Sequence, residues 1–186
     1  MILVIDMNFK KDSLAFYEFV LPIVSIIKKS HPFLIKHRSE LNSKDIDDCE
    51  RIILSGTALK DNEFLGCIED FGWIRKCDKP ILGICAGMEV IGLVFGSSLQ
   101  GCLEIGMKEI RLTRKNSLFS STFKAYELHS HSLQPSEYFD ALAESENCVQ
   151  AMKHREKSIY GVLFHPEVRN REIMKRFILL PNKQKT

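Results

Sequence analysis

The feature that most constrains this chain is a glycine-flanked turn, G-I-C-A-G, at residues 83–87. It follows the apolar run 80–84 and precedes apolar residues with helical spacing over 88–95. A sharp strand-to-helix turn strains the backbone at its central residue, and small residues on both sides relieve the crowding. The pattern therefore predicts a nucleophile elbow, with Cys85 at its tip and a buried strand before it.

A cysteine in such an elbow is suited to nucleophilic chemistry. The N-terminus of the following helix lowers the pKa of the thiol and offers N–H groups to a developing oxyanion. This motif alone leaves a second interpretation open, in which Cys85 is a buried structural cysteine beside two glycines that allow close helix packing.

A histidine near the end of the chain could serve as the base that a cysteine nucleophile needs. Residues 160–167 read Y-G-V-L-F-H-P-E, which predicts a strand ending in His165, with Glu167 two residues further on. A base needs an orienting partner, and a carboxylate on the same side of an extended segment can hold one imidazole nitrogen. His-Pro-Glu alone is typical of a turn. Combined with the elbow, it favours a Cys85–His165–Glu167 triad.

Strands and helices alternate along the first half of the chain, which predicts a parallel sheet covered by helices on both faces. The expected strands are 1–6, 33–36, 51–54 and 80–84, and the expected helices are 13–30, 62–76 and 88–95. Short strands follow at 109–113, 123–128, 141–144, 149–152 and 159–164, before a last helix at 169–180. We expect one α/β domain over 1–186, with a mostly parallel central sheet, a small antiparallel extension and a frayed tail at 181–186.

Composition excludes several classes of function. The 186 residues carry 26 basic and 24 acidic side chains, a net charge of +2, so no basic footprint for nucleic acid exists. The longest apolar run, 19–27, is interrupted by Pro22 and is too short to cross a bilayer, so we expect no membrane contact. The first residues lack the features of a signal peptide. Six cysteines without a C-x-x-C pair indicate reduced thiols in a cytoplasmic protein.

Together, the cysteine elbow and the late F-H-P-E resemble the class I, triad-type glutamine amidotransferases. Nearly the whole chain takes part in the resemblance, including residues 53–56, 127–129 and 151–161. The last stretch is most similar to the separate glutaminase subunit of archaeal GMP synthases. The resemblance implies a flavodoxin-like α/β fold and no cofactor. No metal site is expected, because His129 and His131 alone are too few ligands.

In enzymes of this family, the residue matching Cys85 attacks the side-chain carboxamide of glutamine. The resemblance makes His165 the proton donor to the leaving ammonia and Glu167 its orienting partner. It assigns the oxyanion to the backbone N–H groups of Thr57 and Ala86. Four residues would border the substrate: Gly56, Glu89, His129 and Ser130.

The chain holds neither an S-G-G-x-D-S signature nor a Walker A loop for ATP. The synthetase that uses the ammonia would therefore be a separate ATP-dependent chain, and the resemblance favours a GMP synthase-type partner.

Three residues depart from the family pattern. Glu89 stands where the family has glutamine, Thr57 where it has glycine, and His131 where the GMP synthase subunit has aspartate. These changes leave two alternatives open: a hydrolase of another γ-glutamyl compound, or a non-catalytic binding protein. For Glu89 itself, the simple alternative is that its side chain rotates to solvent or pairs with a basic residue. His131 could likewise be an ordinary surface turn residue.

Overall fold

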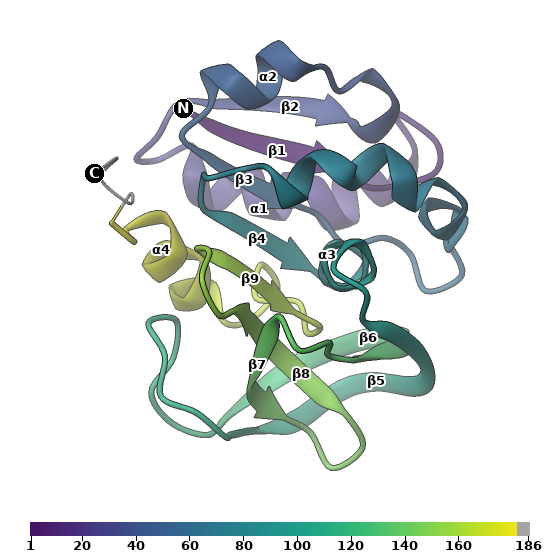
Figure 1. Cartoon of the computed structure of the whole chain (residues 1–186), viewed down its shortest axis with the longest axis vertical. Helices are drawn as coiled ribbons and strands as arrows, with labels where there is room; N and C mark the ends of the chain where they lie inside the picture. The colour runs from purple at the N-terminus through teal and green to yellow at the C-terminus, as the bar shows by residue number, and fades with distance from the viewer. Residues whose placement is uncertain (182–186) are drawn as a thin grey trace.

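A curled mixed sheet organises the protein, and the computed structural model describes residues 1–181 (Figure 1). In spatial order, its parallel strands are β2 (Phe33–His37), β1 (Ile2–Asp6), β3 (Arg51–Leu54), β4 (Ile81–Ile84) and β9 (Ile159–Val162). The sheet continues in antiparallel fashion through β8 (Val149–His154), β7 (Phe139–Glu144), β5 (Ser98–Leu112) and β6 (Phe123–Gln134). The predicted α/β class and the flavodoxin-like order of the parallel strands are confirmed. The tail predicted to fray lies, apart from Pro181, outside the described residues.

Helical segments cover both faces of the parallel strands. In Figure 1, α1 (Leu21–Ile27) lies behind the sheet, while η3 (Glu63–Arg75) and α3 (Ala86–Val94) lie in front of it. The last helix, α4 (Arg171–Ile178), packs on the same side as α1. Alternate residues of β1 therefore belong to two different cores, with Val4 in one and Leu3 in the other. Burial on both faces explains the continuous apolar runs of the parallel strands.

The helix predicted over 13–30 is shorter and irregular. A π-helical turn, η1 (Phe16–Val20), leads into α1, and Pro22 lies in the first turn of α1. Proline is tolerated there because the first N–H groups of a helix have no intrahelical acceptor. The segment predicted as a helix over 62–76 forms 3₁₀ turns instead, with a break at Cys67.

The antiparallel part is larger than predicted. Strands β5 and β6 pair along a long hairpin, from Ser98 opposite Gln134 to Ile110 opposite Phe123. The expected strand at 109–113 is thus only the end of β5. Two short elements were not predicted: α2 (Ser43–Asp48), which begins with an Asn42 capping box, and the 3₁₀ turn η2 (Arg38–Glu40).

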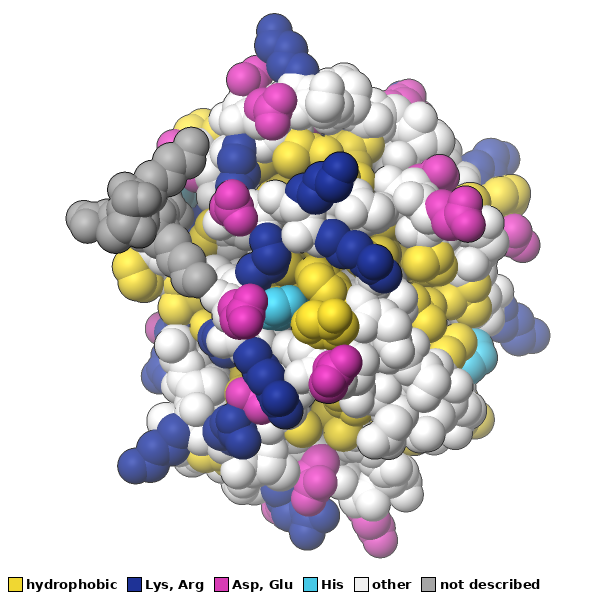
Figure 2. Space-filling view, in the orientation of Figure 1, with side chains coloured by type: hydrophobic (Ala, Val, Ile, Leu, Met, Phe, Trp, Pro, Cys, Tyr) yellow, Lys and Arg dark blue, Asp and Glu magenta, His cyan; other side chains and the backbone are white. Residues whose placement is uncertain are grey.

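The outer surface is mixed in charge. Lys and Arg side chains are interspersed with Asp and Glu over the face seen in Figure 2, without an extended area of one sign. Among residues 1–181, no helix combines the length and the apolar character needed to cross a membrane.

We predict that Gly83→Ala destabilises the protein by about 2–3 kcal/mol, because overpacking against backbone cannot be relieved by a side-chain rotation. A Cβ at Gly83 would lie 2.4 Å from the Gly87 carbonyl oxygen. Urea unfolding measures the change. Gly66→Ala is the matched control, since a Cβ there meets nothing within 4 Å and should change stability by less than about 0.5 kcal/mol. Equal unfolding midpoints for the two variants would contradict the prediction.

Candidate active site

The backbone at Cys85 has the strained geometry expected of an elbow. Its φ of 49° and ψ of −108° lie in a region that L-residues rarely adopt. The Cys85 N–H donates to the Val162 carbonyl at 2.8 Å, which fixes the turn to β9. Close contacts leave no room for side chains at the flanking glycines, since a Cβ at Gly87 would lie 2.6 Å from the Leu54 carbonyl oxygen. Strand β4 and helix α3 thereby present the cysteine at the carboxyl edge of the parallel sheet.

His165 follows the end of β9 and lies beside this cysteine. Its backbone N–H donates to the Tyr126 carbonyl at 2.9 Å, and its ring Nδ1 lies 2.8 Å from Oε1 of Glu167. A Cβ at Gly56 would lie 2.7 Å from Cε1 of His165 and 3.4 Å from Cβ of Cys85. Gly56 therefore lets imidazole and cysteine pack against the same backbone. Both His165 and Glu167 are buried.

Burial and neighbouring groups shift the pKa values of both the Cys85 thiol and the His165 imidazole. Burial raises the pKa of the Cys85 thiol, while the neighbouring His165 acts to lower it. Burial acts to lower the pKa of His165, but the Glu167 charge and the neighbouring thiol outweigh it and raise that pKa well above its ordinary value. The thiol donates to the Leu128 carbonyl at 3.7 Å, and Nε2 of His165 has no hydrogen-bond partner. Nε2 is thus left available for a proton.

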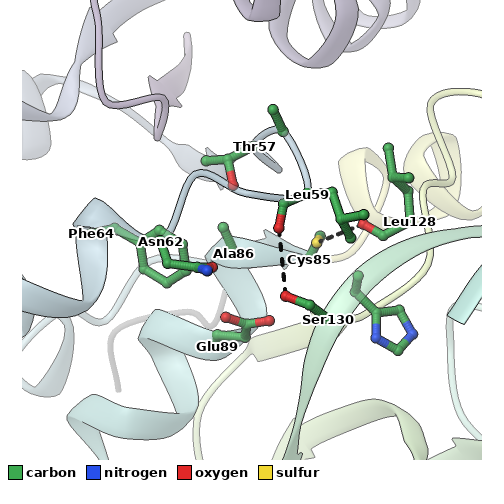
Figure 3. Close-up of a pocket in the computed structure, with 11 residues that line it drawn as sticks. Thr57, Leu59, Asn62, Phe64, Cys85, Ala86, Glu89, Leu128 and Ser130 are labelled. Carbon is green, nitrogen blue, oxygen red and sulfur yellow. Dashed lines mark hydrogen bonds between the residues drawn. The ribbon is translucent and has the colours of Figure 1, made fainter. Parts of the chain in front are cut away.

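Cys85 opens into a small pocket between the segment after β3, helix α3 and strand β6 (Figure 3). The lining brings together most of the site residues expected from the sequence and adds Ala58, Leu59, Asn62, Phe64 and Leu128 to them. The expected residues in the lining are Thr57, Cys85, Ala86, Glu89, His129 and Ser130. Of the others, Gly56 and His165 lie against Cys85 outside the lining, and Glu167 lies behind His165.

Of the two predicted oxyanion donors, Ala86 presents its backbone N–H to the nucleophile, and Thr57 belongs to the pocket wall. Ala86 is the first residue of α3, so its N–H has no intrahelical acceptor, and it faces the sulfur of Cys85. Thr57 lies in the pocket wall, and its hydroxyl donates to the Asp61 carbonyl at 3.0 Å. Thr57, which stands where the family has glycine, does not have a positive φ, so its β-branched side chain fits here without backbone strain.

Glu89 lies in the pocket wall and is only 3 % exposed, so the alternative in which it rotates to solvent is wrong. In Figure 3 its carboxylate lies below Ser130 and faces the cavity. Burial raises the pKa of Glu89 to about 7, with the nearby His129 acting in the opposite direction. The pocket therefore holds a carboxyl group whose charge changes near neutral pH.

The far wall of the pocket comes from β6. The Ser130 hydroxyl donates to the Leu59 carbonyl at 3.5 Å, the dashed line across the cavity in Figure 3. His131 lies on the strand opposite Gly101, with Nδ1 3.1 Å from the Ser130 hydroxyl, so it is not a turn residue. Behind His129 lie Glu104 and Glu127, which sequence reasoning did not single out as site residues. The E-x-H spacing on β6 was a signal for Glu127, but Glu104 is found only from the hairpin register.

Comparisons with known proteins identify relatives of this chain. The family model for class I glutamine amidotransferases matches residues 24–179. The glutamine-hydrolyzing GMP synthase subunit of Picrophilus torridus is 35% identical over 154 residues, covering 74% of this chain and 81% of the relative. The same subunit of the Methanococcus maripaludis strain C5 enzyme is 32% identical over 167 residues, covering 76% and 88%.

Solved structures show the same fold. A Thermoplasma acidophilum protein assigned as this GMP synthase subunit superposes with a TM-score of 0.81 at 25% identity, covering 96% of this chain and 92% of that one. A Thermotoga maritima glutamine amidotransferase gives a TM-score of 0.71 at 20% identity, with 96% and 80% coverage, and supports the fold alone.

We predict that Glu89→Gln stabilises the protein as the pH rises. Because burial raises the folded-state pKa from 4.5 to about 7, stability from the protonated carboxyl is fully present below about pH 4.5 and lost as the pH rises through 7. Between about pH 5 and about pH 8, the free energy of unfolding of Glu89→Gln should rise relative to that of wild type by up to about 3 kcal/mol, as measured by urea unfolding. The control is Glu69→Gln, which changes an exposed glutamate. If wild type and Glu89→Gln have the same pH dependence, the carboxyl is not buried as described.

Proposed function

The chain belongs to the class I glutamine amidotransferase family, and on that basis we propose that it is the glutaminase subunit of a two-chain GMP synthase. It hydrolyses glutamine to glutamate and ammonia, and the ammonia passes to a separate synthase subunit. The observation that carries this proposal is the buried group of Cys85, His165 and Glu167, with the cysteine opening into a small pocket. The names of the GMP synthase relatives support glutamine as the substrate.

In the first half of the reaction, the Cys85 sulfur attacks the carboxamide carbon of glutamine. The thiol proton passes to Nε2 of His165, which is free of other hydrogen bonds. Negative charge develops on the carboxamide oxygen, and the N–H groups of Thr57 and Ala86 stabilise it. His165 then gives the proton to the leaving nitrogen, and the C–N bond breaks to release ammonia and a glutamyl thioester.

In the second half, water replaces the sulfur. His165 takes a proton from the attacking water, the carbon–sulfur bond breaks, and the same proton returns to the Cys85 sulfur as glutamate leaves. Glu167 accepts a hydrogen bond from Nδ1 of His165 and stabilises the imidazolium that forms in each half. In this proposal Gly56, Glu89, His129 and Ser130 surround the substrate, with Gly56 admitting the imidazole and the other three forming the wall.

We further propose that the synthase partner is ATP-dependent, since the chain lacks the sequence signatures of an ATP site. We propose that residues 1–186 act as one domain, which the two cores on the faces of a shared sheet support. A reducing, cytoplasmic location suits a thiol nucleophile and six cysteines without a disulfide among the described residues. The comparisons add no support to a different γ-glutamyl substrate or to a non-catalytic protein.

The direct test is labelling by a diazoketone analogue of glutamine, followed by intact-mass measurement. We predict one adduct per chain, because only Cys85 combines a helix N-terminus, a histidine and an open pocket. Excess glutamine should prevent the adduct, and Cys85→Ala should abolish both the adduct and ammonia release.

Cys67→Ala is the matched control, because Cys67 is partly exposed and does not line the pocket. It should keep the adduct and the ammonia release of wild type. Peptide mapping that finds the adduct on another cysteine, or ammonia release that persists in Cys85→Ala, would overturn the proposed mechanism.

A further inference from the structure

A second cluster of chemically active side chains lies behind the pocket wall. On the β5–β6 hairpin, Glu104 is directly opposite His129, and Glu127 precedes His129 by two residues on the same face of β6. The relative exposures are 2 % for Glu104, 2 % for His129 and 0 % for Glu127. The ligand atoms of these three residues all lie within 4.8 Å of one another. Two buried carboxylates thus face one imidazole.

The tautomer of His129 follows from its partners. Its Nδ1 lies 3.0 Å from the Cys102 carbonyl oxygen, which can only accept, so Nδ1 carries the proton. In the neutral ring, Nε2 then carries a lone pair, 3.4 Å from Oε2 of Glu104 and 3.3 Å from Oε2 of Glu127. The Gln150 side-chain amide nitrogen lies 3.3 Å from the same Nε2 and would have to give up this contact to a bound ion. A ring N–H held by a backbone carbonyl is the usual arrangement for a histidine that binds metal through its other nitrogen.

The two carboxylates are satisfied to different degrees. Glu104 accepts hydrogen bonds of 2.7 Å from the side-chain amides of Asn147 and Gln150. Neither oxygen of Glu127 receives a hydrogen bond, although the side chain is fully buried and Oε2 faces His129. A buried carboxylate without hydrogen-bond donors is costly unless a cation balances it.

The spacing of the ligand atoms fits a small tetrahedral ion. Bonds of about 2.0–2.1 Å to nitrogen and oxygen at tetrahedral angles place the ligand atoms about 3.3 Å apart. The separations of 3.3 and 3.4 Å between Nε2 and the two carboxylate oxygens match this value. One neutral imidazole and two carboxylates would also balance the charge of a divalent ion.

We propose that Glu104, Glu127 and His129 form a zinc site that holds the β5–β6 hairpin against the pocket. An imidazole ligand favours zinc over magnesium or calcium, which prefer oxygen ligands in larger coordination shells. The thiol of Cys148 lies 3.9 Å from Oε2 of Glu104 but belongs to a separate group of possible ligands with Cys102, so the proposed site has three protein ligands. The site is separate from the reacting atoms, since it acts on the pocket through His129 and the Leu128 carbonyl.

The test measures zinc binding directly and does not depend on glutaminase activity. Chelator-treated protein is dialysed against zinc with a competing chromophoric chelator, and bound metal is counted by mass spectrometry. We expect one zinc ion per chain for wild type and for Cys85→Ala, which removes adventitious binding at the elbow. Glu127→Gln should weaken zinc binding at least tenfold while retaining its fold by circular dichroism.

Glu109→Gln is the matched control, because Glu109 is an exposed glutamate on the same strand as Glu104. It should bind zinc as wild type does. Failure of wild type to retain zinc would overturn the proposal and leave a buried cluster that shares protons. Wild-type affinity in Glu127→Gln would also overturn it, because the ion would then lie elsewhere, for example between Cys102 and Cys148, whose sulfur atoms are 3.1 Å apart.

A measurement on the unmodified protein covers the case in which Glu127→Gln fails to fold. X-ray absorption at the zinc edge should show a first shell made mainly of nitrogen and oxygen at about 2.0–2.2 Å, with imidazole scattering beyond it. A first shell made mainly of sulfur at about 2.3 Å would place the ion on the cysteines and overturn the assignment.

Discussion

The close approach of β4 and α3 at the elbow is the constraint on which the rest of the structure depends. A positive φ at Cys85 lets the chain reverse within one residue, and it is tolerated because the Val162 carbonyl and two glycine contacts hold the turn. Gly83 admits the backbone of Gly87, and Gly87 in turn admits the Leu54 carbonyl. The same packing that brings helix against sheet therefore points the thiol away from the sheet edge, and the N–H of Ala86 towards the sulfur.

Sheet order explains why distant segments meet at this point. Strand β9 is inserted beside β4, so a histidine three residues after Val162 reaches a cysteine one residue after Ile84. The β5–β6 hairpin then curls back over the site. The Tyr126 carbonyl accepts a hydrogen bond from the His165 backbone N–H, and the Leu128 carbonyl accepts one from the Cys85 thiol. The parallel strands thus supply nucleophile and base, and the antiparallel extension supplies one wall of the pocket.

Local patterns made the elbow and the F-H-P-E segment predictable, because a glycine-flanked turn and a strand-terminal histidine are written in consecutive residues. The helix expected over 62–76 failed because apolar spacing cannot outweigh Gly66 and Gly72, which favour a broken 3₁₀ path. Glu104, the partner of His129, could not be predicted from the sequence for a different reason. Glu104 lies opposite it only because the register shifts between Gly101 and Glu104, and such a bulge has no signal in the sequence of either strand alone.

Glu89, which replaces the family glutamine, and the buried cluster of Glu104, Glu127 and His129 affect the charge around the same nucleophile. A carboxylate at position 89 raises the thiol pKa of Cys85, and Glu127 brings a second buried acid within the field of His165. Burial raises the pKa of both acids; His129 opposes this effect at each of them, and His165 also opposes it at Glu127. The charge carried by the His129 cluster therefore decides whether the pocket wall is neutral or negative around the nucleophile. A divalent ion bound there would offset the charge of Glu127 and favour the Cys85 thiolate by its own positive charge. The same ion would lower the pKa of Glu89 and so favour the carboxylate that opposes the thiolate, which makes the ionisation of Glu89 the deciding step.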